Sequence, residues 1–294
     1  MKITFLGTSS MIPTKERNHP SILISHEQEN ILIDCGEGTQ RQLKIASINP
    51  CKITKILITH LHNDHILGLP GLLQTLQTQN YSKTLEIYGP SKTSKFIKEI
   101  KNLFKIQLPT KTIEIKKPLF LETKNLQFKA LKMKHNSTCL AYSITEKDKR
   151  KINLNYTKKF GLTKHPLLGE LQKGKKITYK GKKITPEKAT HLIKGKKITI
   201  IYDTVKNPNT IKISKDADLL IAESTYTSSL QDKAKEYLHL TAEQAAEIAK
   251  KANAKQLILT HFSQRYKSSS IFLKEAKQIF KNTRLAKDFM TVNL

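Results

Sequence analysis

Three histidines and an aspartate follow an apolar run directly, and this arrangement restricts the possible fold more than any other feature. The run Ile53–Thr59 is typical of a buried strand, and residues 59–65 read Thr-His-Leu-His-Asn-Asp-His. Imidazole and carboxylate groups hold divalent zinc, so four of them this close can serve two ions rather than one. These four side chains are His60, His62, Asp64 and His65. Ligands at the carboxyl end of a strand point into a crevice. The segment therefore predicts a hydrolytic metal site.

Short apolar runs rich in Ile and Leu alternate with longer helical patterns along the rest of the chain. The predicted strands span Lys2–Leu6, Ser21–Ser25, Asn30–Asp34, Ile53–Thr59, Leu85–Tyr88, Leu126–Lys132, Leu140–Thr145, Lys197–Tyr202, Leu219–Glu223 and Gln256–Thr260. The predicted helices span Gln40–Ile45, Gly71–Gln79, Thr93–Lys105, Ala242–Ala252 and Ile271–Phe280. Thr241 and Gln244 stand where a capping box would start the fourth of these helices. The mixture predicts an α/β class in which helices cover sheets.

Four ligands do not fill two zinc shells, so further donors must come from elsewhere in the chain. His261 and Asp203 each end a strand-like run, and His135 follows another. Their placement at strand ends matches that of His60, so we expect all three to join the cluster. His239 lies just before a predicted helix and can also reach the site from a loop. The remaining histidines, His19, His26, His165 and His191, are expected at the surface.

The chain is strongly basic, with 52 Lys and Arg, nearly all of them Lys, and a formal charge of +28. Such a charge indicates a polyanionic partner, with nucleic acid the first candidate and an anionic membrane surface the second. A general habit of Lys-rich composition is the alternative. Residues 150–197 hold 15 Lys and Arg against Glu170 and Glu187, a net +13. This Gly-punctuated stretch is expected to bury little core and to project as a basic arm; a flexible loop without a task is the alternative.

The rest of the sequence indicates a soluble intracellular protein. Cys35, Cys51 and Cys139 have no CxxC spacing and no even pairing, which predicts a reduced, cytoplasmic compartment and argues against zinc bound through thiolates. The first residues are too short an apolar run for a signal peptide, and no stretch approaches a membrane span. We expect one domain over residues 1–294, with the arm as an insertion.

Residues 59–65, His135, Asp203 and His261, in this order, resemble the metallo-β-lactamase superfamily. The resemblance implies a four-layer αβ/βα sandwich with two zinc ions per subunit at the sheet edges. It gives one zinc to His60, His62 and His135, and the other to Asp64, His65 and His261, with Asp203 bridging both. A redox branch of the superfamily binds iron and has a glutamate at the second cluster position, so His62 favours zinc.

Within the superfamily the chain is similar to the ribonuclease Z family over almost its whole length. The segments that carry this similarity are Phe5-Leu-Gly-Thr-Ser-Ser, Pro13-Thr-Lys-Glu-Arg-Asn18, Ile33-Asp-Cys-Gly-Glu-Gly-Thr-Gln-Arg-Gln42, Leu259-Thr-His-Phe-Ser-Gln-Arg-Tyr266 and the basic arm. The resemblance implies an endonuclease that removes the 3′ trailer of precursor tRNA, leaving a 3′-hydroxyl on the tRNA and a 5′-phosphate on the trailer. Asp64 would orient the attacking water, and Glu223 and His239 would supply the leaving-group proton. Lys15 and Arg17 would contact the acceptor end, and the family typically forms homodimers.

Three positions depart from the family pattern, and two other functions stay open. Ala222 stands where the family has a histidine, His165-Pro166 replaces a Gly-Pro or Pro-Gly step in the arm, and Tyr202 replaces a small residue before Asp203. A phosphodiesterase or sulfatase acting on small esters would use the same metal site, although such a substrate needs no basic arm. A nonenzymatic RNA-binding protein with structural zinc is the other alternative.

Overall fold

The computed structural model describes residues 1–294 and divides the chain into two units. The first unit comprises residues 1–122, 128–144 and 197–294, and the second comprises residues 123–127 and 145–196. The second unit contains almost all of the predicted basic arm. Each unit has its own buried core.

The first unit contains a seven-stranded sheet in the order β18-β1-β2-β3-β4-β5-β6. Its strands are β1 (Lys2–Gly7), β2 (Ser21–His26), β3 (Glu29–Ile33), β4 (Lys55–Leu57), β5 (Leu85–Gly89), β6 (Thr110–Glu114) and β18 (Thr291–Asn293). The pairs from β18 to β3 are antiparallel, and those from β3 to β6 are parallel. The helices α1 (Thr39–Ile45), α3 (Leu69–Thr78) and α4 (Thr93–Leu103) pack on it through leucines and isoleucines such as Leu72, Leu76 and Ile97. The central strands are covered on both faces, which is why they read as continuous apolar runs.

The second sheet of this unit has the order β17-β16-β15-β14-β9-β8-β7. Its strands are β7 (Leu119–Glu122), β8 (Leu126–Met133), β9 (Cys139–Glu146), β14 (Lys197–Ile201), β15 (Leu219–Glu223), β16 (Leu257–Thr260) and β17 (Thr283–Leu285), and β14 to β17 run parallel. Its helices are α8 (Pro208–Ser214), α9 (Gln231–Glu236), α10 (Ala242–Lys251) and α11 (Ser270–Ile279). Thr241 and Gln244 form the predicted capping box at the start of α10. The alanine-rich face of α10 lies in the core with Leu257 and Phe272.

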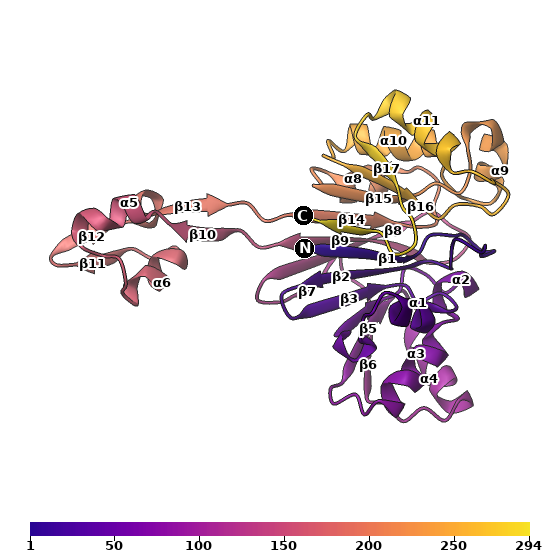
Figure 1. Cartoon of the computed structure of the whole chain (residues 1–294), viewed down its shortest axis with the longest axis horizontal. Helices are drawn as coiled ribbons and strands as arrows, with labels where there is room; N and C mark the ends of the chain where they lie inside the picture. The colour runs from indigo at the N-terminus through magenta and orange to yellow at the C-terminus, as the bar shows by residue number, and fades with distance from the viewer. The chain divides into compact units, whose positions relative to one another are not determined.

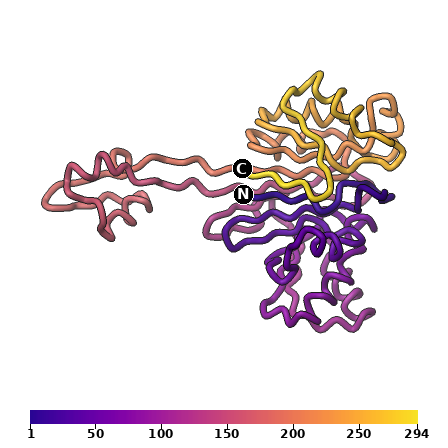
Figure 2. Tube along the Cα trace, viewed as in Figure 1, coloured from indigo at the N-terminus to yellow at the C-terminus, as the bar shows by residue number.

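The two sheets face each other, and their helices cover the outer faces (Figure 1). Side chains join the sheets, since Tyr142 on β9 donates its hydroxyl to the carbonyl of Ile58, and Phe120 on β7 packs against Tyr88 on β5. The predicted four-layer αβ/βα class is thereby confirmed. The two ends of the chain meet (Figure 2), and the amino group of Met1 donates to the carbonyl of Leu294 over 3.0 Å.

The second unit has more structure than its composition predicts. β10 (Lys149–Ile152) pairs with β13 (Thr190–Ile193), and β11 (Ile177–Tyr179) pairs with β12 (Lys182–Ile184), both antiparallel. The helices α5 (Leu154–Thr157), α6 (Leu167–Gln172) and α7 (Pro186–Ala189) accompany them. A small core is formed by Leu162, Leu171, Ile177, Ile184 and Ala189. This core is small, because only a few apolar residues are spaced among the lysines.

All ten predicted strands and all five predicted helices are present, with boundaries that differ by a few residues. The elements that were not predicted are short: β6, β7, β17, β18, α8, α9, and the strands and helices of the second unit, together with the four-residue helix α2 (Asn63–Ile66) and three 3₁₀ turns at Pro50–Lys52, Lys158–Phe160 and Ser228–Leu230. Such pieces give too few residues for a periodic pattern. None of the helices has the length and apolar character needed to cross a membrane.

Candidate metal centre

The predicted ligands come from five places along the chain and meet where strands of both sheets end. His60 and His62 follow β4, while Asp64 and His65 lie on α2. His135, Asp203 and His261 follow β8, β14 and β16. The carboxyl ends of parallel strands lie at one edge of a sheet, and loops there are free to present polar groups. The structure thus brings together all seven side chains that the sequence predicted as ligands.

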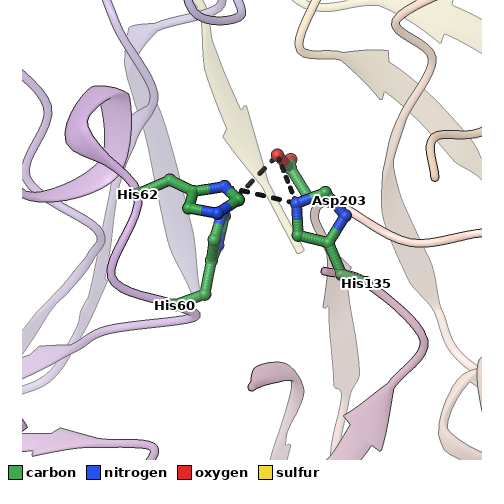
Figure 3. Close-up of side chains that lie close together, drawn as sticks. All are labelled: His60, His62, His135 and Asp203. Atoms are coloured by element: carbon green, nitrogen blue, oxygen red, sulfur yellow. Dashed lines mark hydrogen bonds and ion pairs between the residues drawn. The ribbon is translucent and has the colours of Figure 1, made fainter. Parts of the chain in front are cut away.

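The first group consists of His60, His62, His135 and Asp203, whose rings and carboxylate converge (Figure 3). Oδ2 of Asp203 lies 3.5 Å from Nε2 of His60 and 3.8 Å from Nε2 of His135. Nδ1 of His62 lies 3.2 Å from Nε2 of His135. Four donor atoms therefore surround one point.

The second group consists of Asp64, His65, Asp203 and His261, and all four are buried. Oδ2 of Asp64 lies 3.3 Å from Nε2 of His65 and 3.4 Å from Nε2 of His261. The other carboxylate oxygen of Asp203, Oδ1, lies 3.6 Å from Nε2 of His65 and 3.3 Å from Nε2 of His261. Asp203 therefore directs one oxygen to each group, which is the geometry of a bridging ligand.

Several donor atoms in this cluster have no hydrogen-bond partner although they are buried. They are Nε2 of His60, Oδ1 of Asp64, Nε2 of His65 and Oδ1 of Asp203. A buried polar atom without a partner costs about 1–3 kcal/mol, so such atoms call for an explanation. Metal ions would satisfy the two ring nitrogens and the oxygen of Asp203 at once. The donor set fits a metal cofactor.

Burial and neighbouring charges shift the pKa values of the histidines in this cluster. Burial lowers the pKa of His60 to about 4, which keeps its imidazole neutral and able to bind a cation. Burial acts to lower the pKa of His65 too, but the carboxylates of Asp64, Asp34 and Asp203 outweigh it and raise that pKa well above its ordinary value. The cluster thus attracts positive charge, here a proton and in a loaded site a metal ion.

Asp34, which was not among the predicted site residues, supports the second group from behind. Its two buried oxygens accept hydrogen bonds from the Thr59 amide, the Thr59 hydroxyl and Nδ1 of His65, each over 2.7 Å. A bond at Nδ1 leaves Nε2 of His65 free to face the cluster, as second-layer carboxylates do for metal-bound histidines. Asp34 also ends a predicted strand, as Asp203 ends another. The same sequence signal could therefore have identified Asp34 as a candidate site residue.

Glu223 and His239 form a second chemical element beside the cluster. Oε1 of Glu223 lies 3.0 Å from Nδ1 of His239, and Oε2 accepts a hydrogen bond from the Thr225 hydroxyl over 2.6 Å. Thr225 Oγ1 also lies 2.9 Å from Nδ1 of His261, so this threonine, missed in the sequence, links the pair to a candidate ligand. Burial acts to lower the pKa of His239, but Glu223 and Asp203 raise it to about 9. His239 therefore carries a proton that Glu223 holds in place.

A cleft of about 290 Å³ opens above these groups. His62, Asp64, His135, His239 and His261 line its floor. Ligand sites of about 300–1,000 Å³ take small molecules, so the cleft has room for one phosphodiester and its immediate neighbours. A larger hollow of about 970 Å³ between α1 and α3 contains none of the metal-ligand groups.

The remaining sequence expectations concern residues around the cluster. Lys15 is exposed, whereas Arg17 is half-buried with its guanidinium 5.3 Å above the ring of Phe262, the residue after His261. Tyr202 is fully buried, and its ring meets those of His65 and His261 edge-on. His19 was wrongly expected at the surface: it is buried, because its ring bonds the carbonyl of Met11.

Known proteins are similar to this chain over its whole length. Residues 1–158 match the family model described as Anti-Pycsar protein Apyc1. Ribonuclease Z of Methanothermobacter thermautotrophicus is 39% identical over 297 residues, covering 100% of this chain and 97% of the relative. Ribonuclease Z of Archaeoglobus fulgidus is 38% identical over 298 residues with the same coverage. Among solved structures, the short form of human tRNase Z has a TM-score of 0.72 at 30% identity and covers 100% of this chain and 99% of that one. The metallo-β-lactamase fold protein YhfI of Bacillus subtilis has a TM-score of 0.74 at 22% identity, with 99% and 98% covered, and shows the fold.

Proposed function

The chain belongs to the ribonuclease Z family and, by residues 1–158, to the Anti-Pycsar protein Apyc1 family, and we propose that it is an endoribonuclease that removes the 3′ trailer of precursor tRNA. The products are a 3′-hydroxyl on the tRNA and a 5′-phosphate on the trailer. One observation carries the proposal: two groups of donors share the buried Asp203 in a chain whose full length aligns with ribonuclease Z relatives.

Two zinc ions per subunit fit the donor sets best. Zinc bonds to nitrogen and oxygen of about 2.0–2.2 Å at tetrahedral angles place neighbouring ligand atoms about 3.3–3.6 Å apart. The donor atoms of both groups lie 3.2–3.8 Å apart along the pairs given above. No thiolate takes part, which matches a hydrolytic rather than a structural zinc site.

When bound, a pair of zinc ions lowers the pKa of water to near neutrality and offsets charge on the phosphate. The chain's own side chains supply the rest. Oδ1 of Asp64, a partnerless oxygen on a side chain that lines the cleft, accepts a proton from the attacking water and orients the oxygen of that water toward phosphorus. As the bond from phosphorus to the 3′ oxygen breaks, His239 donates its proton to that oxygen. Glu223 holds His239 in position through Nδ1 and leaves its other ring nitrogen for the substrate.

Substrate binding relies on lysines. We assign the tRNA-binding role to the arm, residues 150–197, with a net charge of +13. Lys182 and Lys183 lie exposed on its β11–β12 hairpin, suited to phosphate contacts that ignore sequence. Lys15 and Arg17 are proposed to contact the acceptor end. A cytoplasmic homodimer completes the proposal.

The direct test is to incubate the purified protein with a 3′-extended tRNA transcript and map the product ends. A 3′-hydroxyl at the discriminator nucleotide is expected. Asp64→Ala should abolish cleavage while RNA binding persists; wild-type protein that binds the transcript without cutting it would instead indicate a nonenzymatic RNA-binding protein.

A phosphodiesterase or sulfatase on small esters is the second candidate, and the small cleft volume favours it. Replacing Lys182 and Lys183 by Gln separates the two functions, with Lys95 and Lys98 of α4 as the matched control pair. RNA cleavage should weaken in the first variant alone, while turnover of a chromogenic phosphodiester stays unchanged in both. RNA cleavage that is unaffected by the arm lysines would support the small-ester function.

A further inference from the structure

Three large hydrophobic side chains stand exposed at the rim of the cleft. Met11 is 52% exposed, Ile12 53% and Tyr237 53%, and all three line the cleft that contains the metal-ligand groups. Single exposed hydrophobic residues are ordinary on protein surfaces, whereas a group of them at one site marks a binding surface. Met11 and Ile12 come from the loop after β1, and Tyr237 directly follows α9.

The loop that carries Met11 and Ile12 is held firmly by hydrogen bonds. Ser9 donates its hydroxyl to the carbonyl of Ile12 over 2.7 Å, and Nε2 of His19 lies 2.9 Å from the carbonyl of Met11. At the neck of the loop, Asp288 accepts from the Thr8 hydroxyl and the Asn18 amide, each over 2.7 Å. The fixed backbone of the loop therefore keeps both side chains exposed to solvent, as a preorganised contact surface requires.

Tyr237 is tied to the catalytic groups in the same way. Its neighbour Leu238 accepts a bond from Nδ1 of His135 over 3.2 Å with its carbonyl, and its backbone adopts a positive φ of 59°. The amide of His239 bonds the carbonyl of Ala234 over 2.7 Å. The turn that presents His239 to the cleft therefore also fixes Tyr237 at its rim.

We propose, on the basis of the proposed function, that Met11, Ile12 and Tyr237 form a subsite for the nucleobase next to the cleaved phosphodiester. The subsite is continuous with the metal centre, so a nucleotide whose phosphate lies over the ligands brings its base to this rim. Apolar side chains and a phenol ring contact the face of any base, which suits an enzyme whose substrates differ in sequence. The lysines that contact the RNA phosphates and the side chains that contact the base are then different groups of residues.

A chemical double-mutant cycle tests this subsite. The substrates are precursor tRNAs with either an intact nucleotide or an abasic one beside the cleaved bond, on each side in turn. Base stacking is worth about 5- to 150-fold in affinity, so Tyr237→Ala should raise KM for the intact RNA by a factor in this range and change kcat less. On the abasic RNA that lacks the contacted base, Tyr237→Ala and the wild-type protein should have the same KM.

Three companion variants keep the result interpretable. Tyr237→Phe should retain wild-type KM, and Met11→Ser, on a separate segment, should repeat the selective loss. Leu103→Ala on α4, a residue 75% exposed and away from the cleft, should change nothing. Equal losses on intact and both abasic RNAs, or no loss, would overturn the subsite while leaving the nuclease function intact. Failure of the wild-type protein to cut any of these RNAs would overturn the proposed function itself.

Discussion

Replacing Asp34 by Asn tests whether the layer behind the ligands controls metal binding. Asp34 is fully buried, and its φ of 56° is a left-handed conformation that Asn also adopts readily. The change therefore keeps the shape and the backbone and removes only the charge and one acceptor. Whichever way the new amide turns, its NH₂ group faces at least one donor among the Thr59 amide, the Thr59 hydroxyl and His65 Nδ1.

The magnitude follows from these contacts. One buried donor left without an acceptor costs about 1–3 kcal/mol of folding free energy. Losing the carboxylate at Nδ1 makes Nε2 of His65 a poorer ligand, and the loss of such a partner weakens metal binding by about 10- to 100-fold. We therefore expect moderate destabilisation together with a clear loss of metal affinity.

The assay is a calorimetric titration of metal-stripped protein with Zn²⁺, accompanied by urea unfolding without metal. Asp288→Asn is the matched control, since Asp288 also accepts three hydrogen bonds, from Thr8, Asn18 and Gln42, but touches no ligand. It should leave zinc affinity unchanged. The reasoning is refuted if Asp34→Asn binds zinc as the wild type does, or if both variants lose affinity equally.

Three further outcomes are expected. His239→Gln should lower kcat on RNA by about 10²- to 10⁴-fold, yet much less on a p-nitrophenyl phosphodiester, whose leaving group needs no proton; equal losses would remove the proton-donor role. Burial raises the pKa of Asp288 to about 6, so the folded chain holds that proton more tightly than the unfolded one. Its stabilising contribution is complete below pH 4 and is lost as the pH rises through 6. In urea unfolding, the free energy of unfolding of Asp288→Asn should therefore rise relative to that of the wild type between pH 4 and 6. A difference between the two proteins that does not change with pH would contradict this. Removing metal with a chelator should lower Tm by about 5 °C or more, because an ion at 100 times its Kd adds about 2.7 kcal/mol; an unchanged Tm would argue against a loaded site.

Much of the fold was predictable because its central strands are strongly apolar. Runs such as Lys197–Tyr202 and Leu219–Glu223 are covered on both faces, so burial leaves an unbroken pattern in the sequence. The strands β7 and β10 are short and partly exposed, and no such pattern marks them. The small core of the basic arm leaves no such pattern either, since Ile177 and Ile184 each stand alone after a pair of lysines.

The sequence by itself determined the chemistry: which side chains can hold metal, at which strand ends they stand, and that the chain is heavily basic. Tertiary structure alone decided how these groups meet. Only the packing of the two sheets sets Asp203 between the two donor groups, puts Asp34 behind His65, and brings Tyr237 to the same rim as Met11. The physical reason is that spacing along the chain governs local geometry, whereas distances of a few ångströms between remote residues depend on how whole layers pack.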